Sequence, residues 1–359
     1  MAEPATGTEF TLDTAAELAE AEGGVAIEGR SPWYLAWRRL RRNYVAFAFL
    51  GLFILIVVCC ALAPVYSKHV AHIGPNTTNI KGTITVDGKQ VPVVSQGGIV
   101  NGKLTSATPI GPQWWHAGGQ YVLGADPLGR DVAVRLLYGG INSLFIGIGS
   151  AIICTIIAIF LSLLAGYFRG WSDFTITRFY DLFYAFPVIL LGIALGAALA
   201  INGLNWGPIH LQSGSLWIPL LVISYVLIPY IGRPMRGQIL SLREKEFVEA
   251  SIAQGARPLR VMFFELLPNI ASSVLVFFTL IIANNIILEA ALSFLGAGVQ
   301  PPNASWGTLI ADGQDLILTA PWLAIFPGIA IVLTVLSLNV FGDGLRDALD
   351  PRAKVKIEH

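Results

Sequence analysis

The chain has 359 residues and no net formal charge at pH 7; 54% of its residues are hydrophobic and 13% are charged. Ordinary soluble domains carry roughly a quarter charged residues, so a water-soluble fold could not bury this much apolar surface. The neutral charge balance also lacks the clustered basic face that is typical of nucleic-acid binders, so we expect no nucleic-acid partner. The composition therefore indicates a protein that lies in a lipid bilayer.

Six runs free of Asp, Glu, Lys, Arg and His are long enough to cross that bilayer. A helix needs about 20 residues to span the hydrocarbon core, and in lipid its backbone polar groups must bond to one another. We therefore predict an all-α polytopic membrane protein with six transmembrane helices. The predicted spans are Tyr44–Ala63, Leu144–Ala165, Leu182–Ile201, Leu216–Gly232, Ile270–Leu288 and Trp322–Phe341.

The segment before the first span divides into two parts. Residues 1–30 are acidic and poor in apolar residues, which predicts a disordered cytoplasmic tail. Residues 31–63 begin with SPWYLAWRRLRRN, in which aromatic residues alternate with four arginines. This composition is typical of a helix in the membrane interface, so we expect an interfacial elbow helix that leads into the first transmembrane helix.

Residues 64–143, between the first two spans, form the largest polar segment of the chain. Within it, TITVDGKQVPVV at residues 83–94 is typical of a strand, an Asp-Gly turn and a second strand. We therefore predict a small extracytoplasmic β-rich insertion between helices 1 and 2. An irregular loop is the alternative, because Pro92 and several glycines limit regular strand pairing.

Residues 144–341 are predicted to form the transmembrane core. Arg178 and Asp181 directly precede the third span of the chain, Leu182–Ile201. They are three residues apart and can pair on one helical face, which we interpret as a structural ion pair. Pro187 is expected to kink the same span, because proline lacks the backbone N–H that continues a helix.

A long polar loop at residues 233–269 interrupts the core. The apolar residues of SLREKEFVEASIAQ, residues 241–254, recur at helical spacing and predict a first helix. Gly255 tolerates the left-handed conformation that commonly ends a helix, and Pro258 suits the first turn of the next one. The loop is therefore predicted to be a helix, a sharp corner and a second helix.

The fifth span carries polar residues toward its far end, at Asn284, Asn285 and Glu289. Polar side chains in a span are expensive and usually face the protein interior or a water-filled path, so these three residues are candidates for lining a translocation path. Hydrogen bonding between helices, which would only hold the bundle together, is the alternative.

Basic residues predict the orientation of the spans, because they concentrate on the cytoplasmic side. With the N-terminus inside, the cytoplasmic segments hold 17 of the 23 Lys and Arg, including those of a C-terminal tail at residues 342–359. The short outer loops, residues 202–215 and 289–321, contain none. We therefore expect a multi-pass protein of the cell membrane with both termini cytoplasmic.

The loop at residues 233–269 resembles the EAA loop of ATP-binding-cassette (ABC) importer permeases. The family pattern is EAAxxxG, nine residues and IxLP; this chain has EASIAQG, nine residues and ELLP, with Ser251 and Glu265 departing from it. In that family the loop forms the helix that docks on the cytoplasmic ATPase. The resemblance implies that the matching residues couple the chain to an ATPase, and they are Glu249, Ala250, Gly255, Leu267 and Pro268.

Three further stretches resemble the C-type permease of dipeptide, oligopeptide and nickel importers. DPLGRDVAVRLLYGG at 126–140 is similar to a signature of that subfamily, with Ala125 and Val134 where Thr and Ser are usual. EAALSFLGAGVQPPNASWG at 289–307 and LNVFGDGLRDALDPR at 338–352 match its later patterns. The long segment between spans one and two and the acidic tail depart from its compact form.

This resemblance implies the type I importer permease fold and a set of partners. These are a homologous B-type permease subunit, two ABC ATPase subunits, which bind ATP and magnesium, and an extracytoplasmic substrate-binding protein. Di- or oligopeptides are the implied substrates, and nickel chelates or another small solute are the alternative. An ion-coupled secondary transporter is a remote alternative, which has no use for an EAA-like loop.

The chain itself shows no signs of catalysis. It lacks the GxxxxGK[ST] loop that cradles nucleotide phosphates, and it offers no nucleophile with a base and no metal-binding constellation. We therefore expect a non-enzyme that binds no cofactor or metal.

Overall fold

The computed structural model describes residues 32–349 apart from 96, 101–102, 106 and 208. The predicted tail at 1–30 lies outside the described residues, as do residues 350–359 of the tail predicted at 342–359, whereas residues 342–349 belong to the last helix. The described chain is mainly helical. Its helices are α2 (Pro32–Arg42), α3 (Tyr44–Ala61), α4 (Ala63–Tyr66), α5 (Val132–Phe168), α6 (Gly170–Tyr184), α7 (Val188–Asn202), α8 (Trp217–Arg243), α9 (Glu246–Ala253), α10 (Pro258–Arg260), α11 (Leu267–Phe294), α12 (Trp306–Gly313) and α13 (Trp322–Leu349). Two π-helical segments, η1 (Ser67–Ala71) and η2 (Val261–Leu266), and a 3₁₀ turn, η3 (Gln314–Leu316), complete them.

The predicted membrane spans are confirmed, with one difference. Within the described residues, α3, α5, α8, α13 and the continuous α10–η2–α11 are long and apolar enough to cross a membrane. The predicted third span, Leu182–Ile201, is not one helix but the end of α6 and most of α7, bent by 89°. Pro187, with a ψ of 126°, lies outside the helical region and separates the two. Counting this bent pair as one span gives six.

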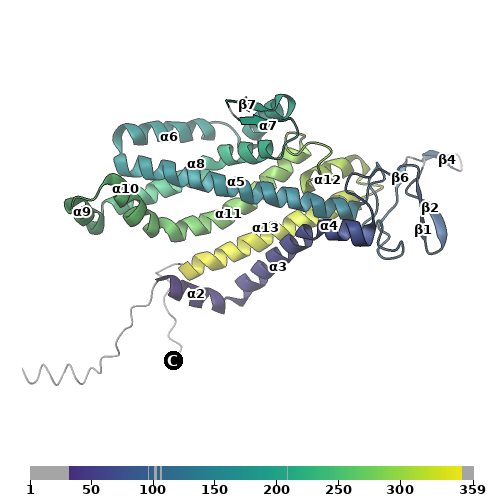
Figure 1. Ribbon diagram of the computed structural model, residues 1–359, viewed down its shortest axis with the longest axis horizontal. Helices are drawn as coiled ribbons and strands as arrows, with labels where there is room; N and C mark the ends of the chain where they lie inside the picture. Colours follow the sequence, from purple (N-terminus) through teal and green to yellow (C-terminus); the bar gives the residue numbers. More distant parts are fainter. Residues whose placement is uncertain (1–31, 96, 101–102, 106, 208, 350–359) are drawn as a thin grey trace, which may run out of the picture.

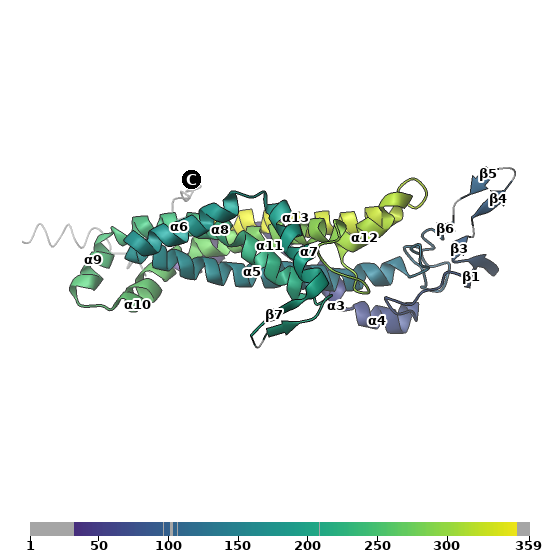
Figure 2. The same ribbon diagram turned by 90° about the horizontal axis from the view of Figure 1, so that it is seen from above.

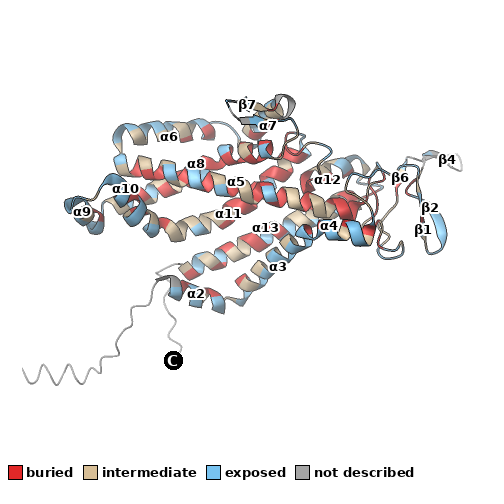
Figure 3. Ribbon diagram, in the orientation of Figure 1, coloured by how far each residue is buried: buried red, intermediate tan, exposed pale blue. Residues whose placement is uncertain are grey.

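The position of each span follows from how much of it the chain buries. In the apolar part of α8, 72% of the residues are buried, against 11% in α3. The helix α8 therefore lies at the centre of the bundle, packed on α5, while α3 lies at its edge against α13 (Figure 3). Residues exposed on α3 can contact lipid, which is as apolar as they are.

A segment with several short strands joins η1 to α5. Strands β1 (Thr83–Val86) and β2 (Lys89–Pro92) form an antiparallel hairpin. Asp87 and Gly88 both have positive φ, as the type I′ turn of such a hairpin requires. The remaining strands pair β3 (Val94–Ser95) with β6 (Thr108–Pro109), β4 (Gly98–Val100) with β5 (Lys103–Thr105) and, between α7 and α8, β7 (Leu204–Trp206) with β8 (Ile209–Leu211).

The two ends of the bundle differ. Figure 1 places α9, α10, α2 and the last turn of α13 at one end, with the insertion and α12 at the other. The second view agrees (Figure 2). The ideal rise of 1.5 Å per residue makes the 37-residue helix α5 about 55 Å long, well beyond the roughly 30 Å hydrocarbon core. The helix α5 is therefore longer than the hydrocarbon core is thick, and part of it extends beyond the core.

Candidate coupling site and outer ion cluster

The helix α9 is a short exposed helix at one end of the bundle. Of its residues, Val248 alone is buried, in the same apolar cluster as Val261, Met262 and Leu266 of η2. This contact anchors one side of α9 on the base of the fifth span and leaves the other sides uncovered. The predicted first helix is shorter than expected, because Ser241–Arg243 belong to α8.

The corner after α9 has the predicted geometry. Gly255 has a φ of +82°, its N–H donates to the Ile252 carbonyl at 2.9 Å, and the Ala256 N–H donates to the Ser251 carbonyl at 3.1 Å. These two bonds form a Schellman motif, which satisfies the last carbonyls of the helix. Pro258 then occupies the first turn of α10. The chain reverses within a few residues because each of them favours the conformation it adopts.

The second helix of the loop continues without a break into the fifth span. Between them η2 is π-helical, and the Leu267 N–H donates to the carbonyl of Met262, five residues earlier. Pro268 follows directly, and a proline ring inside a regular α-helix would clash with the carbonyl four residues before it. The wider π turn gives that ring room, so α9 is attached to the membrane span through a continuous helix.

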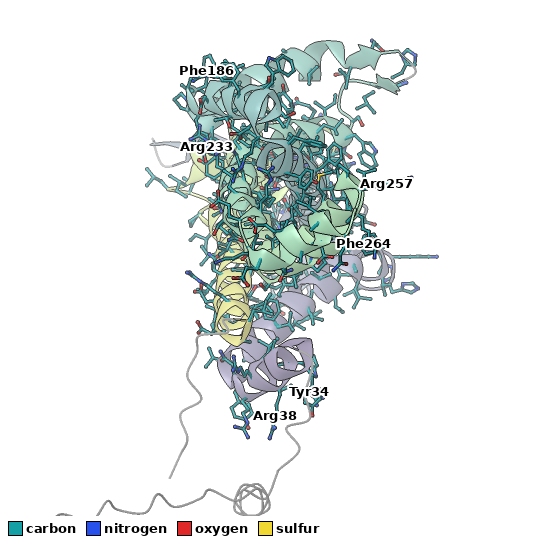
Figure 4. All side chains as sticks on the ribbon, turned by 90° about the vertical axis from the view of Figure 1, so that its left-hand side faces the viewer. Tyr34, Arg38, Phe186, Arg233, Arg257 and Phe264 are labelled. Atoms are coloured by element: carbon teal, nitrogen blue, oxygen red, sulfur yellow. The ribbon has the colours of Figure 1, made fainter. Side chains whose placement is uncertain are left out.

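The surface of this end combines exposed apolar side chains with charges. Phe264 is 75% exposed and Leu259 64%. Arg257 and Phe264 lie on one side of the end, as Figure 4 shows. Between α9 and η2 lies a hollow of about 370 Å³, lined in part by Ala250 and Gly255. Exposed apolar patches of this kind mark interaction sites.

The residues matched to the EAA pattern therefore lie in two places. Glu249 and Ala250 are exposed on α9, and Gly255 is exposed at its corner. Leu267 and Pro268 begin α11, away from the hollow, where Leu267 is partly buried and Pro268 exposed.

The three polar residues of the fifth span do not share one environment. Asn284 is exposed, whereas Asn285 and Glu289 are fully buried. The side-chain amide of Asn285 lies 2.6 Å from the Ser150 hydroxyl of α5, and the Ser293 hydroxyl donates to Glu289 Oε1 at 2.7 Å. Asn285 and Glu289 thus lie inside the bundle of this chain, and Asn284 alone of the three faces outward.

Ion pairs join α6 to α8 near the end that carries α9. The predicted pair is present, with Arg178 Nη1 3.4 Å from Asp181 Oδ2, but Arg233 of α8 lies closer to the same carboxylate, at 2.6 Å. Asp173 accepts two bonds from the guanidinium of Arg236. These pairs hold α6 along α8 up to the bend at Pro187.

A second polar site lies at the opposite end and was not predicted. We call Asp126, Arg130, Arg135 and Asp312 the outer ion cluster, after the side of the membrane on which the distribution of arginines and lysines predicts it. Arg130 Nε contacts Asp126 Oδ2 at 2.5 Å, and Arg130 Nη2 contacts Asp312 Oδ2 at 3.0 Å. Arg135, 2% exposed, lies 3.6 Å from Asp126 and 3.4 Å from Asp312. The cluster joins the segment before α5 to α12.

Asp131 supports the outer ion cluster from the N-cap of α5. Its carboxylate accepts bonds from the backbone N–H groups of Tyr121, at 2.6 Å, and Val134, at 3.1 Å. Burial raises the pKa of Asp131, and these two hydrogen bonds partly offset the rise. Burial also raises the pKa of Asp312, although the nearby arginines lower it in part.

Gly129 has a φ of +71° and no room for a Cβ, which would lie 2.5 Å from the Asn79 backbone. The residues of the DPLGRD stretch therefore depend on one another for their conformation. The resemblance of this stretch to a family signature is the sequence signal that could have pointed to the outer ion cluster.

The segments on either side of this cluster also interlock by hydrogen bonds. Asn142 Nδ2 donates to the Ala304 carbonyl at 2.7 Å, and the Trp306 indole donates to the Leu136 carbonyl at 3.1 Å. The two signature stretches at 126–140 and 289–307 thus contact each other although they lie far apart in the sequence.

The fold defines a multi-pass membrane protein with a short exposed helix, α9, at one end. The sequence profile of the family described as binding-protein-dependent transport system inner membrane component matches residues 158–355, more than half of the chain. The profile of the N-terminal TM domain of oligopeptide transport permease C matches residues 31–80. The chain belongs to this family of inner membrane components.

Similar proteins extend the likeness over almost the whole chain. The glutathione transport system permease protein GsiD of Pectobacterium atrosepticum is 36% identical over 325 residues, which cover 90% of this chain and 93% of the relative. The dipeptide transport system permease protein DppC of Alkalihalophilus pseudofirmus is 35% identical over 90% of this chain and 91% of the relative. A solved structure of the MetNI methionine ABC transporter in an inward-facing conformation matches with a TM-score of 0.48 and 19% identity, over 60% of this chain and 96% of that one.

Family membership distinguishes an ABC-type permease from an ion-coupled secondary transporter. The chain is an ABC-type permease, a multi-pass membrane component of a binding-protein-dependent transport system, and the ion-coupled alternative is set aside.

Proposed function

We propose that this chain is one of two homologous permease subunits of an ATP-driven importer of short peptides. The importer also contains two cytoplasmic ATPases, which bind ATP and magnesium, and an extracytoplasmic substrate-binding protein. The names of the relatives support the substrate class, since they are dipeptide and glutathione permeases. The observation that carries the mechanism is the exposed helix α9, held by a tight corner at the end of a continuous span.

The helix α9 is the contact with an ATPase. Its outer sides are uncovered, and Glu249 has no ion-pair partner among the described residues. A movement of the ATPase that displaces the start of η2 would also displace the fifth span, because η2 and α11 form one continuous helix. This arrangement favours transmission of a push or rotation from the ATPase to the fifth span.

The fifth span contributes to the translocation path. Ser273, Phe277, Leu280 and Asn284 follow one another at spacings of four, three and four residues, which places them on one face of α11. An exposed amide facing lipid is unfavourable, so Asn284 supports a path or a subunit interface on this face. The buried Asn285 joins α11 to α5 instead, and Glu289 accepts a bond from Ser293 of its own helix.

The proposed docking is tested by replacing Glu249 with alanine. Removing a charge that becomes buried on docking costs about 2–5 kcal/mol, so ATPase binding to permeases in nanodiscs is expected to weaken about 30-fold or more. Asp347→Ala, which removes an exposed carboxylate from α13 at the same end, serves as the control. Equal ATPase affinity in the Glu249→Ala and Asp347→Ala complexes would rule out a docking role for Glu249.

A further inference from the structure

A pocket of about 330 Å³ lies between α8, α11 and α13, toward the end of the bundle that carries α9. Three helices contribute polar side chains to it: Gln238 from α8, Ser272 and Ser273 from α11, and Arg346 from α13. The pocket is therefore assembled by the fold from residues far apart in the sequence.

These polar side chains are free to bind something else. Within the described part of the chain, none of the four makes a side-chain hydrogen bond or ion pair with another residue. Asp343 and Asp347 lie within one turn of Arg346 on α13, and neither forms an ion pair with it. One guanidinium, two hydroxyls and a carboxamide thus converge on one space without a protein partner.

This donor set suits an oxyanion. A guanidinium presents several N–H donors in a fixed fork that matches a carboxylate, and hydroxyl and amide groups add neutral donors. The other side of the pocket is apolar, with Val276, Phe277 and Leu280, and can take an aliphatic or aromatic side chain. We propose that this pocket binds the C-terminal carboxylate of a short peptide that has reached the inner end of the path; the proposal rests on the proposed function.

The phosphate of an anionic lipid has similar chemistry, but the surroundings of the pocket favour a peptide. The face of α11 that lines the pocket continues outward through Leu280 to the exposed Asn284. Lipid chains extending from a bound headgroup would lie along this face and would leave the amide in hydrocarbon, at a high cost. A path filled with water and peptide carries no such cost.

The test measures binding of radiolabelled dialanine, and of dialanine C-terminal amide, to the complete complex in phosphatidylcholine nanodiscs without the external binding protein. Dialanine amide is expected to bind about tenfold more weakly than dialanine, since it loses a charge-assisted bond. The Arg346→Gln variant is expected to weaken dialanine binding by a similar factor and to leave amide binding unchanged. Arg38→Gln, an exposed arginine of α2 outside the pocket, should change neither.

Three outcomes would overturn the proposal. The first is an unchanged affinity for dialanine in Arg346→Gln. The second is an equal loss of dialanine and dialanine amide binding in that variant. The third is that phosphatidylglycerol, added to the nanodisc, displaces dialanine from the unmutated complex but not from the variant. Dialanine uptake into proteoliposomes separates this result from the proposed function. If the unmutated complex took up no dialanine, the proposed importer function would be contradicted. If uptake were normal and Arg346→Gln bound dialanine as tightly as the unmutated complex, only the proposed role of the pocket would be contradicted.

Discussion

Gly255 shows how one residue can set the direction of the proposed docking helix α9. Its φ of +82° lies in the region that residues with a Cβ rarely adopt. Apart from Gly255 and its two neighbours in the chain, no heavy atom lies within 4 Å of the place where a Cβ would sit. The need for glycine is therefore a matter of backbone conformation and not of space, and a substitution here changes the direction of α9 without disturbing the core.

Gly255→Val is expected to cost about 1–3 kcal/mol of backbone strain and to misdirect α9. In the reconstituted complex, peptide uptake should fall while ATP hydrolysis continues, so that more ATP is consumed per peptide. Gly51→Val in α3 is the matched control, since Gly51 is helical and exposed, with nothing within 4 Å of its added Cβ. Normal ATP consumption per peptide in the Gly255→Val complex would refute the coupling role of the corner.

At the scale of elements, the outer ion cluster shows how α5 is joined to α12. Arg135 belongs to the first turns of α5, yet its charge is balanced by Asp126 before that helix and by Asp312 in α12. A buried arginine is tolerated when carboxylates surround it, and the loss of one partner leaves the others buried with less compensation. The cluster therefore holds the insertion and α12 in one arrangement.

Arg135→Met is expected to destabilise this end by about 1–3 kcal/mol, because the buried carboxylate of Asp126 loses one of its two cations and keeps only Arg130. The melting temperature of the purified protein should fall, and trypsin should cut the insertion at Lys81 or Lys89 faster than before. Lys68→Met removes an exposed cation from the neighbouring η1 and should do neither. If Arg135→Met and Lys68→Met melted alike, the cluster would not stabilise the fold.

The bend between α6 and α7 also belongs to this scale. A proline predicts a disturbed helix, and the structure shows an 89° turn. The size of the turn depends on contacts that a local pattern cannot express. Leu191, Leu195 and Leu199 of α7 pack in one apolar cluster with Ile218 and Val222 of α8, and ion pairs hold α6 along the other half of α8.

The whole molecule has two chemically distinct ends, and the distribution of arginines and lysines predicts that the end with α9 is cytoplasmic. Lys81, Lys89 and Lys245 are all exposed, so differences in their reactivity report the side of the membrane and not burial. In intact cells an impermeant amine reagent should label Lys81 and Lys89, and Lys245 only after permeabilisation. Labelling of Lys245 before the other two would reverse the orientation.

Much of this protein could be predicted from its sequence because the relevant signals are local. Charge-free runs predict spans, since lipid excludes charges wherever the run lies in the chain. The corner at Gly255 and Pro258 and the hairpin turn at Asp87 and Gly88 depend on the conformations that those residues themselves prefer. Such features need no knowledge of distant contacts.

The tertiary structure decided which side of each span faces inward. The spans are apolar on nearly all sides, so no periodic pattern distinguishes the exposed Asn284 from the buried Asn285 beside it. The hydrogen-bond partner of Asn285 is Ser150, 135 residues away, and Arg135 and Asp312 are separated by 177 residues. Whether a polar group is buried and paired depends on which helices meet, and that is set by packing across the whole bundle.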